Sequence, residues 1–124
     1  MSVLRVLEGR YAVCRLAPDD PVPEFASGGT FYSITRTASE LSMVCAEDRV
    51  PAGVQFEGGW RIFQVEGPLD FALTGILASI AMPLAQAGIA IFAISTFDTD
   101  FVLVKEEKLT RAIEALTGAG HTAF

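Results

Sequence analysis

Positive charge is scarce in this chain. Lys and Arg number 9 against 15 Asp and Glu, which gives a net charge of −6 at pH 7. The basic residues are scattered, whereas binding to a nucleic acid or to an anionic membrane surface needs clustered Lys and Arg. We therefore expect neither a nucleic acid nor a membrane among the partners.

Cysteine is rare as well. Cys14 and Cys45 lie in apolar, strand-like segments and show neither CxxC spacing nor a neighbouring histidine. We interpret them as buried free thiols in a reducing compartment, and the sequence leaves their redox state open. The N-terminus lacks the basic segment and long apolar segment of a signal peptide. Together these features predict a cytoplasmic protein.

Recognisable catalytic motifs are missing. The sequence contains no GxSxG, P-loop, GxGxxG or HExxH motif. The single histidine, His121, has no evident base or metal partner, and its position near the C-terminus predicts a surface or edge role. Asp98 and Asp100 lack the spacing of a calcium-binding loop. We predict that the protein is not an enzyme and that it uses no metal or cofactor.

Charge is absent altogether between Asp70 and Asp98. A run of this length suggests a membrane span, but Gln86-Ala87-Gly88 is typical of a helix end and Pro83 interrupts the middle. Beyond Gly88 the apolar residues follow the pattern of a buried strand. The run therefore predicts the core of a globular domain.

The second half of the chain predicts a βαββαβ order, which is the ferredoxin-like arrangement of an α+β fold. The expected elements are strand 60–66, a helix from Asp70 as its N-cap to about residue 87, strands 90–95 and 101–105, helix 106–117 and a closing strand within 121–124. Leu73, Ile76, Leu77, Ile80 and Leu84 share one face of the long helix. Pro83 is expected to kink this helix or to loosen its last turn.

The first half predicts a compressed version of the same order. Strands are expected at 4–7, 11–16, 31–35 and 41–45, with a short helix within 17–29 and one helical turn at 47–51. We therefore predict a degenerate module at residues 1–58 and a complete one at 59–124. Both are expected to have antiparallel sheets with helices on one face.

Polar residues at the two ends of the uncharged run form the best candidate for a binding site. Gly67 and Asp70 follow a strand and open the predicted helix, and Thr96, Phe97 and Asp100 follow the next strand. Both groups are expected at one edge of the sheet. Helix N-terminal N–H groups bind a carboxylate, and a protein carboxylate binds an ammonium, so this edge suits an amino acid. The same residue types are also common in ordinary turns and caps.

Stretches along nearly the whole chain, from about residue 10 to 120, resemble one family. Residues 60–77, 83–89 and 94–100, the last with the tract Ser-Thr-Phe-Asp-Thr-Asp, resemble the ACT-domain group that includes the eukaryotic cytosolic arginine sensors called CASTOR. Small stand-alone bacterial proteins of this group look similar at residues 32–37, 40–42 and 44–51.

The resemblance implies the βαββαβ fold and a small-molecule sensor, usually for amino acids, that binds its ligand between paired domains. The implied ligand-binding residues are Thr96, Phe97, Asp100, Asp70, Gly67, Phe71, Ser42 and Met43. Asp100 is expected on the positive group of the ligand, and Ser42 and Met43 are expected to face the site from the other module. Because the sensors contain twice as many modules as this chain, the resemblance also implies a homodimer.

The predicted function is therefore that of a non-catalytic amino-acid sensor or regulatory protein, with its ligand at an interface between ACT modules. The alternative is a structural or dimerisation module that has the fold and binds no ligand. Acidic residues at the candidate site favour a cationic or zwitterionic amino acid. Neither the identity of that amino acid nor a regulated protein partner is visible in the sequence.

Overall fold

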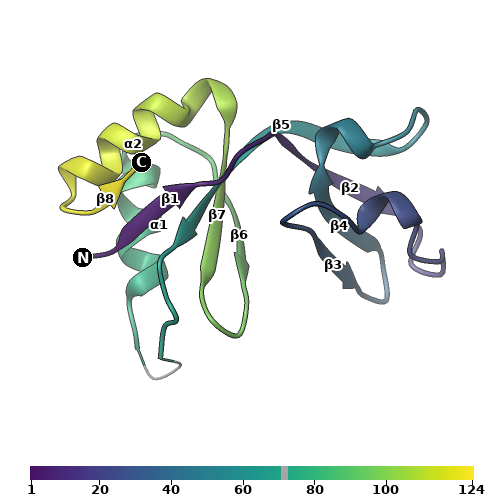
Figure 1. Ribbon diagram of the computed structural model, residues 1–124, viewed down its shortest axis with the longest axis horizontal. Coiled ribbons are helices and arrows are strands. Elements are labelled where there is room, and N and C mark those ends of the chain that lie inside the picture. The colour runs from purple at the N-terminus through teal and green to yellow at the C-terminus, as the bar shows by residue number, and fades with distance from the viewer. Residues whose placement is uncertain (71–72) are drawn as a thin grey trace. The chain divides into compact units, whose positions relative to one another are not determined.

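The computed structural model describes residues 1–70 and 73–124, and the chain divides into two compact units (Figure 1). Unit 1 comprises Met1–Glu8 and Arg61–Phe124, and unit 2 comprises Gly9–Trp60. The division into domains at residues 1–58 and 59–124 stays a prediction. The compact units differ from it mainly in residues 1–8, which belong with the C-terminal part of the chain.

Unit 1 has the predicted βαββαβ order with one additional strand. Its elements are β1 (Val3–Val6), the second half of β5 (Gln55–Val65), α1 (Ile76–Gln86), β6 (Phe92–Ser95), β7 (Asp100–Lys105), a 3-10 turn (Glu106–Lys108), α2 (Leu109–Gly118) and β8 (Thr122–Ala123). The α+β fold class is confirmed, and so is the short closing strand.

Strand β1 lies between β5 and β8 in the sheet of unit 1. It is antiparallel to β5, with Val6 opposite Phe63, and parallel to β8, with Leu4 opposite Ala123. The sheet continues from β5 to β7 and then to β6. The pair β1–β8 is an exception to the predicted antiparallel pairing, and it places the first and last strands side by side (Figure 1).

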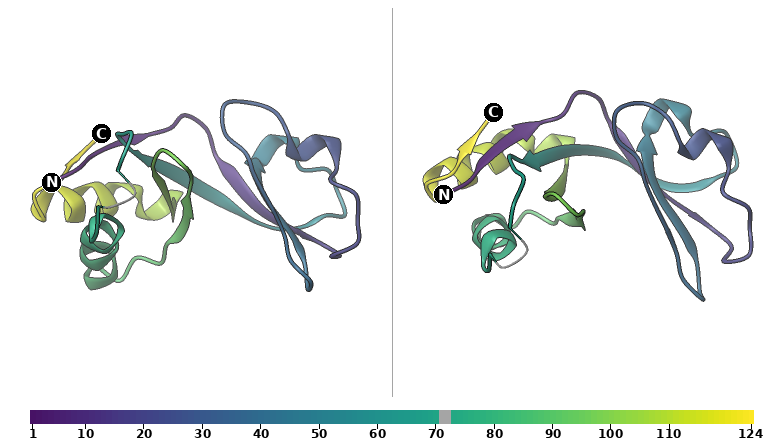
Figure 2. Two further views of the ribbon diagram at one scale, coloured as in Figure 1. Left: turned by 90° about the horizontal axis from the view of Figure 1, so that it is seen from below. Right: turned by 60° about the horizontal axis from the view of Figure 1, so that its bottom comes forward.

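The two helices of unit 1 pack against each other and against the sheet (Figure 2). The core contains Leu4, Phe63, Val65, Ile80, Leu84, Ile89, Val102, Val104, Ala112 and Leu116, all of them buried. Ile80 and Leu84 come from α1 and lie on the face that the helical spacing predicts. Burial of each such side chain contributes about 1.5–3 kcal/mol, so the shared core fixes α1 on the sheet.

The prediction that Asp70 caps the long helix is wrong, because α1 begins at Ile76 with Gly75 as its N-cap. Gly75 has a left-handed backbone with φ of 78°, a conformation that ends helical geometry and that glycine adopts without strain. As a result Leu73 lies before the helix and is 54% exposed rather than part of its buried face. Pro83 lies inside α1, and Gly88 ends the helix with φ of 73° as predicted.

Strand β6 is less buried than predicted. Its residues alternate between half-buried and exposed, because β6 pairs only with β7 and forms an edge of the sheet. Within the described ranges, no helix is long and apolar enough to cross a membrane.

Unit 2 is built mainly from strands, as expected of a compressed module. Its elements are β2 (Tyr11–Leu16), a 3-10 turn (Glu24–Ala26), β3 (Ser33–Arg36), β4 (Leu41–Ala46), a second 3-10 turn (Glu47–Arg49) and the first half of β5. The strand order is β3-β4-β2-β5, antiparallel throughout. Single 3-10 turns take the places of the two helices, and the small core is centred on Ala12, Cys14, Ala26, Leu41, Met43 and Cys45.

Both cysteines are free and buried, as predicted, and they lie on neighbouring strands. Ala12 on β2 is opposite Cys45 on β4, so Cys14 and Cys45 lie on the same face, diagonally across the strand pair. Burial raises the pKa of the Cys14 thiol from 9.0 to about 12, with a smaller contribution from the neighbouring Cys45. Burial also raises the pKa of Cys45.

The raised pKa values predict a loss of stability at alkaline pH. Well below pH 9 both thiols are neutral in the folded and the unfolded chain, so they contribute no pH dependence to the free energy of unfolding there. As the pH rises from about 9 toward about 12, the unfolded thiols ionise first and the free energy of unfolding falls. Urea titrations at a series of pH values should show this fall in the wild type and a shallower one in Cys14→Ala. Equal slopes for the two proteins would contradict the prediction.

Candidate ligand-binding site

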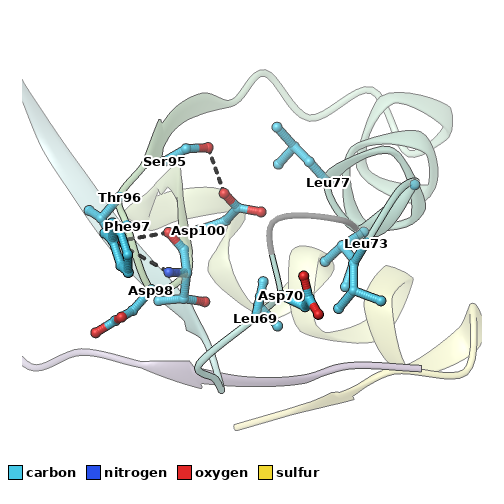
Figure 3. Close-up of a pocket in the computed structure, with 12 residues that line it drawn as sticks. Leu69, Asp70, Leu73, Leu77, Ser95, Thr96, Phe97, Asp98 and Asp100 are labelled. Carbon is cyan, nitrogen blue, oxygen red and sulfur yellow. Dashed lines mark hydrogen bonds between the residues drawn. The ribbon is translucent and has the colours of Figure 1, made fainter.

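A hollow of about 290 Å³ lies in unit 1 between the β6–β7 hairpin and the start of α1 (Figure 3). Its lining consists of Leu69, Asp70, Leu73, Gly75, Ile76, Leu77 and the six residues from Ser95 to Asp100. This volume is at the lower end of the range for small-molecule pockets, so the hollow suits a ligand of the size of one amino acid.

The hairpin wall is held by hydrogen bonds within its turn and by one bond to the central strand β5. The N–H and the hydroxyl of Thr96 both donate to the carbonyl of Thr99, at 2.8 and 3.0 Å. The side chain of Thr99 is buried, and its hydroxyl donates to the carbonyl of Val65 at 2.6 Å. The turn that carries Phe97 and Asp98 is therefore fixed in place before any ligand binds.

Asp100 begins β7 opposite Ser95, the last residue of β6. The Ser95 hydroxyl donates to Oδ1 of Asp100 at 2.5 Å. In Figure 3 the Asp100 carboxylate points into the space between the hairpin and the side on which Leu77 lies. A carboxylate accepts several hydrogen bonds at once, so the serine orients the group while the carboxylate keeps the capacity to bind a cation.

The opposite wall is the beginning of α1. Ile76 and Leu77 are its first residues, and their N–H groups belong to the first turn, which has no carbonyl partners inside the helix. The helix dipole adds partial positive charge at this end. A hydrogen bond of 2.7 Å from the N–H of Leu69 to the carbonyl of Asp98 ties the segment before α1 to the hairpin.

The charges of the lining are all negative. The charged residues of the lining are Asp70, Asp98 and Asp100, and the residues described around the hollow include no Lys, Arg or His. The hollow thus combines carboxylates with a helix N-terminus. This combination suits a ligand that carries both a carboxylate and one or more positive groups, as an amino acid does. Among the described residues, no group of three or more His, Cys, Asp or Glu side chains is placed to hold a metal ion.

The structure brings together four of the predicted site residues, Asp70, Thr96, Phe97 and Asp100, and their part in ligand binding stays a prediction. The helix N-terminus that faces them is that of Gly75 and Ile76, whereas the sequence pattern placed it at Asp70. Sequence reasoning also missed Ser95 as the partner of Asp100. The cross-strand pairing of a hairpin around residues 96–99 would have indicated that contact.

The other predicted residues lie elsewhere. Gly67 does not line the hollow but lies beside the hairpin, where an added Cβ would meet Asp98 and Thr99, and Phe71 lies outside the described residues. Ser42 lines a separate hollow of about 230 Å³ in unit 2, and the side chain of Met43 is buried in the core of that unit. Whether Ser42 or Met43 takes part in ligand binding stays a prediction.

Replacing Gly67 by alanine tests whether the segment before α1 has to approach the hairpin closely. A Cβ at this position would lie 3.1 Å from the N of Leu69 and 3.2 Å from the carbonyl O of Asp98, the two atoms of the bond that joins these segments. Because both are backbone atoms, Gly67→Ala should lower the free energy of unfolding by about 1–3 kcal/mol in urea titrations.

Gly118→Ala is the matched control, because Gly118 is the last residue of α2 and a Cβ there meets no atom within 4 Å. Alanine in a helix is more stable than glycine by about 0.5–1 kcal/mol, so this variant should be as stable as the wild type or more so. A Gly67→Ala protein as stable as Gly118→Ala would show that the segment does not depend on the close approach.

Comparison with known proteins identifies the family of this chain. The family model described as ACT domain matches residues 55–118, which is more than half of the chain, and a second model, described as an N-terminal domain, matches residues 9–53. The chain belongs to the ACT domain family.

Curated relatives share the name "Cytosolic arginine sensor for mTORC1 subunit 1". The human protein is 47% identical over 108 residues, and the Bos taurus protein is 34% identical over 110 residues. These alignments cover 81% and 77% of this chain but only 32% and 33% of the relatives. The chain thus spans about a third of the length of the curated relatives that it matches.

Solved structures extend the similarity over the whole chain. An X-ray structure of a protein from Agrobacterium tumefaciens is 43% identical, with a TM-score of 0.94 over 99% of this chain and 92% of that one. A Vibrio cholerae protein of unknown function has 21% identity and a TM-score of 0.78, covering 95% of this chain and 89% of its own. The regulatory subunit of aspartate kinase from Thermus thermophilus has 14% identity and a TM-score of 0.64, covering 93% and 97%. The last two show similarity of fold.

Proposed function

We propose that this chain is a non-catalytic regulatory protein that binds an amino acid in the hollow between the β6–β7 hairpin and α1. The observation that carries the proposal is the placement of the Asp100 carboxylate across one small hollow from the N-terminus of α1, with Asp70 and Asp98 also among the lining residues (Figure 3). Membership of the ACT domain family and the sensor names of the relatives support it. Because those relatives are named cytosolic, we also propose a cytoplasmic location.

In the proposed complex, the carboxylate of the ligand accepts hydrogen bonds from the N–H groups of Ile76 and Leu77. The α-ammonium or a cationic side chain binds the carboxylate of Asp100, which Ser95 orients. Asp70 and Asp98 add negative charge around the hollow and therefore favour a cationic amino acid. L-arginine, which the names of the relatives specify for those proteins, is the first ligand to test.

A second ACT module is proposed to cover the ligand. Phe97 is 79% exposed and Leu73 is 54% exposed, so apolar side chains stand at the rim of the hollow. Ligand pockets usually bury most of the ligand surface, which this open rim does not do alone. A second copy of the chain would supply the cover in a homodimer. A ligand that binds one arrangement of the modules more tightly would then shift the population toward it.

Thermal unfolding in the presence of each common amino acid at millimolar concentration tests the proposal, with sedimentation velocity on the same samples to follow the dimer. A ligand at 100 times its Kd stabilises the folded state by about 2.7 kcal/mol, which raises Tm by several degrees. We expect such a shift with L-arginine or a close analogue. No shift with any amino acid would overturn the proposal and favour the alternative of a structural or dimerisation module.

A further inference from the structure

Helix α1 contains a backbone carbonyl that its own sequence leaves without the usual partner. In an α-helix, each N–H donates to the carbonyl four residues earlier. Pro83 lies inside α1 and has no N–H, so the carbonyl of Ser79 receives no bond of this kind. A donor from another element or from water can take the place of the missing bond.

The imidazole of His121 supplies that donor. Its Nε2 lies 2.9 Å from the carbonyl O of Ser79, and its Nδ1 lies 3.1 Å from the backbone N of Ser2. Because the N–H of Ser2 donates to Nδ1, that nitrogen carries no proton, and the partners assign the tautomer in which Nε2–H donates to Ser79. Of the predicted surface or edge role of His121, the edge position is confirmed, because the residue directly precedes the edge strand β8. The surface location is wrong, since the residue is only 4% exposed.

Ser79 is connected directly to the ligand hollow. Its N–H donates to the carbonyl of Gly75 at 2.9 Å, and its hydroxyl donates to the carbonyl of Ile76 at 2.7 Å. Gly75 and Ile76 both line the hollow. No side chain caps α1 at Gly75. The bond from His121 attaches the first turn to the rest of unit 1 from outside the helix, in addition to the packing of Ile76 and Leu77 against the core.

We propose that His121 is a positioning residue for the ligand site. It binds the Ser79 carbonyl that Pro83 leaves without a donor, and it thereby fixes the helical wall of the hollow against the strand pair β1–β8. The part of this inference that concerns ligand affinity rests on the proposed function, whereas the attachment of the helix does not.

Two substitutions at His121 distinguish the hydrogen bond to Ser79 from the hydrogen bond to Ser2. The amide of His121→Gln can reach the place of Nε2 and donate to Ser79, whereas the amide of His121→Asn stays near the place of Nδ1 and loses the bond to the helix. In isothermal titrations with L-arginine, His121→Asn should raise Kd about tenfold, and His121→Gln should stay within about threefold of the wild type. Equal Kd values for the two variants would overturn the proposal.

Amide hydrogen exchange without ligand tests the attachment independently. The amides of residues 79–82 should exchange about tenfold faster in His121→Asn than in His121→Gln. If L-arginine binds to none of the proteins but this difference is present, the proposed function fails and the attachment stands. Unchanged exchange in His121→Asn would overturn the attachment itself.

A double-mutant cycle with Pro83→Ala completes the experiment, because alanine restores an N–H that can bond to Ser79 within the helix. In the Pro83→Ala background, His121→Asn should raise the Kd for L-arginine and the exchange rate of residues 79–82 by no more than about threefold. If His121→Asn raised the Kd and the exchange rate by the same factor in the wild-type and in the Pro83→Ala background, His121 would not act through the Ser79 carbonyl. That result would overturn the proposal.

Discussion

Replacing Asp100 by asparagine is expected to weaken binding of L-arginine by about 10- to 100-fold, since a hydrogen bond to a charged group contributes about 1.5–3 kcal/mol. Asparagine keeps the size of the side chain and an oxygen that can accept the bond from Ser95. The change therefore removes mainly the negative charge that faces the hollow. Isothermal titration of the wild type and Asp100→Asn measures the effect.

The matched control is Glu107→Gln, which changes the net charge by the same amount. Glu107 is exposed and lies in the 3-10 turn after the other end of β7, outside the lining of the hollow. Its Kd should stay within about twofold of the wild type, because exposed charges at a distance are screened by salt. A similar loss of affinity in both variants would mean that the effect comes from overall charge and not from contact with Asp100.

Phe63→Ala is expected to have the largest effect on stability. Phe63 lies on β5, is fully buried and packs in the core of unit 1 with side chains from both helices. Removing such a ring leaves a cavity and costs about 3–5 kcal/mol, which is a large fraction of the stability of a domain. Urea titration should show a midpoint far below that of the wild type.

Phe97→Ala provides the comparison for the same chemical change at an exposed position. Phe97 lies at the tip of the β6–β7 hairpin and is largely exposed. Without ligand, the free energy of unfolding of the Phe97→Ala protein should differ from that of the wild type by no more than about 0.5 kcal/mol. If Phe63→Ala were tolerated as well as Phe97→Ala, the core of unit 1 would not be packed as described.

The sequence predicts the order of elements in unit 1 because that order is a local property. Alternation in the strands, helical spacing in α1 and α2 and the glycine after α1 each arise within about ten residues. The start of α1 is missed for a local reason too. Asp70 is a good N-cap residue, but Gly75 has a positive φ, and a residue of that geometry cannot lie inside a helix.

Contacts between distant residues cannot be derived from such patterns. Ser2 and His121 are 119 residues apart, and Ser79 and His121 are 42 apart, so neither hydrogen bond leaves a periodic signal. The pairing of β1 with β5 and β8 is of the same kind. The hairpin wall of the hollow, in contrast, can be predicted from the sequence. Its residues 95–100 form a single tract, and their cross-strand pairs are close in the sequence.

The pairing of β1 determines where this chain can be joined to a relative in a chimaera. Gly9–Trp60 is nested within unit 1, since the chain leaves that unit after Glu8 and returns at Arg61. A fragment that starts at residue 59 lacks β1 and thus leaves β8 without its neighbour. A chimaera with another family member therefore needs two junctions, one near residue 8 and one within β5 near residue 61, because a single junction near residue 61 takes the paired strands β1 and β8 from different parents.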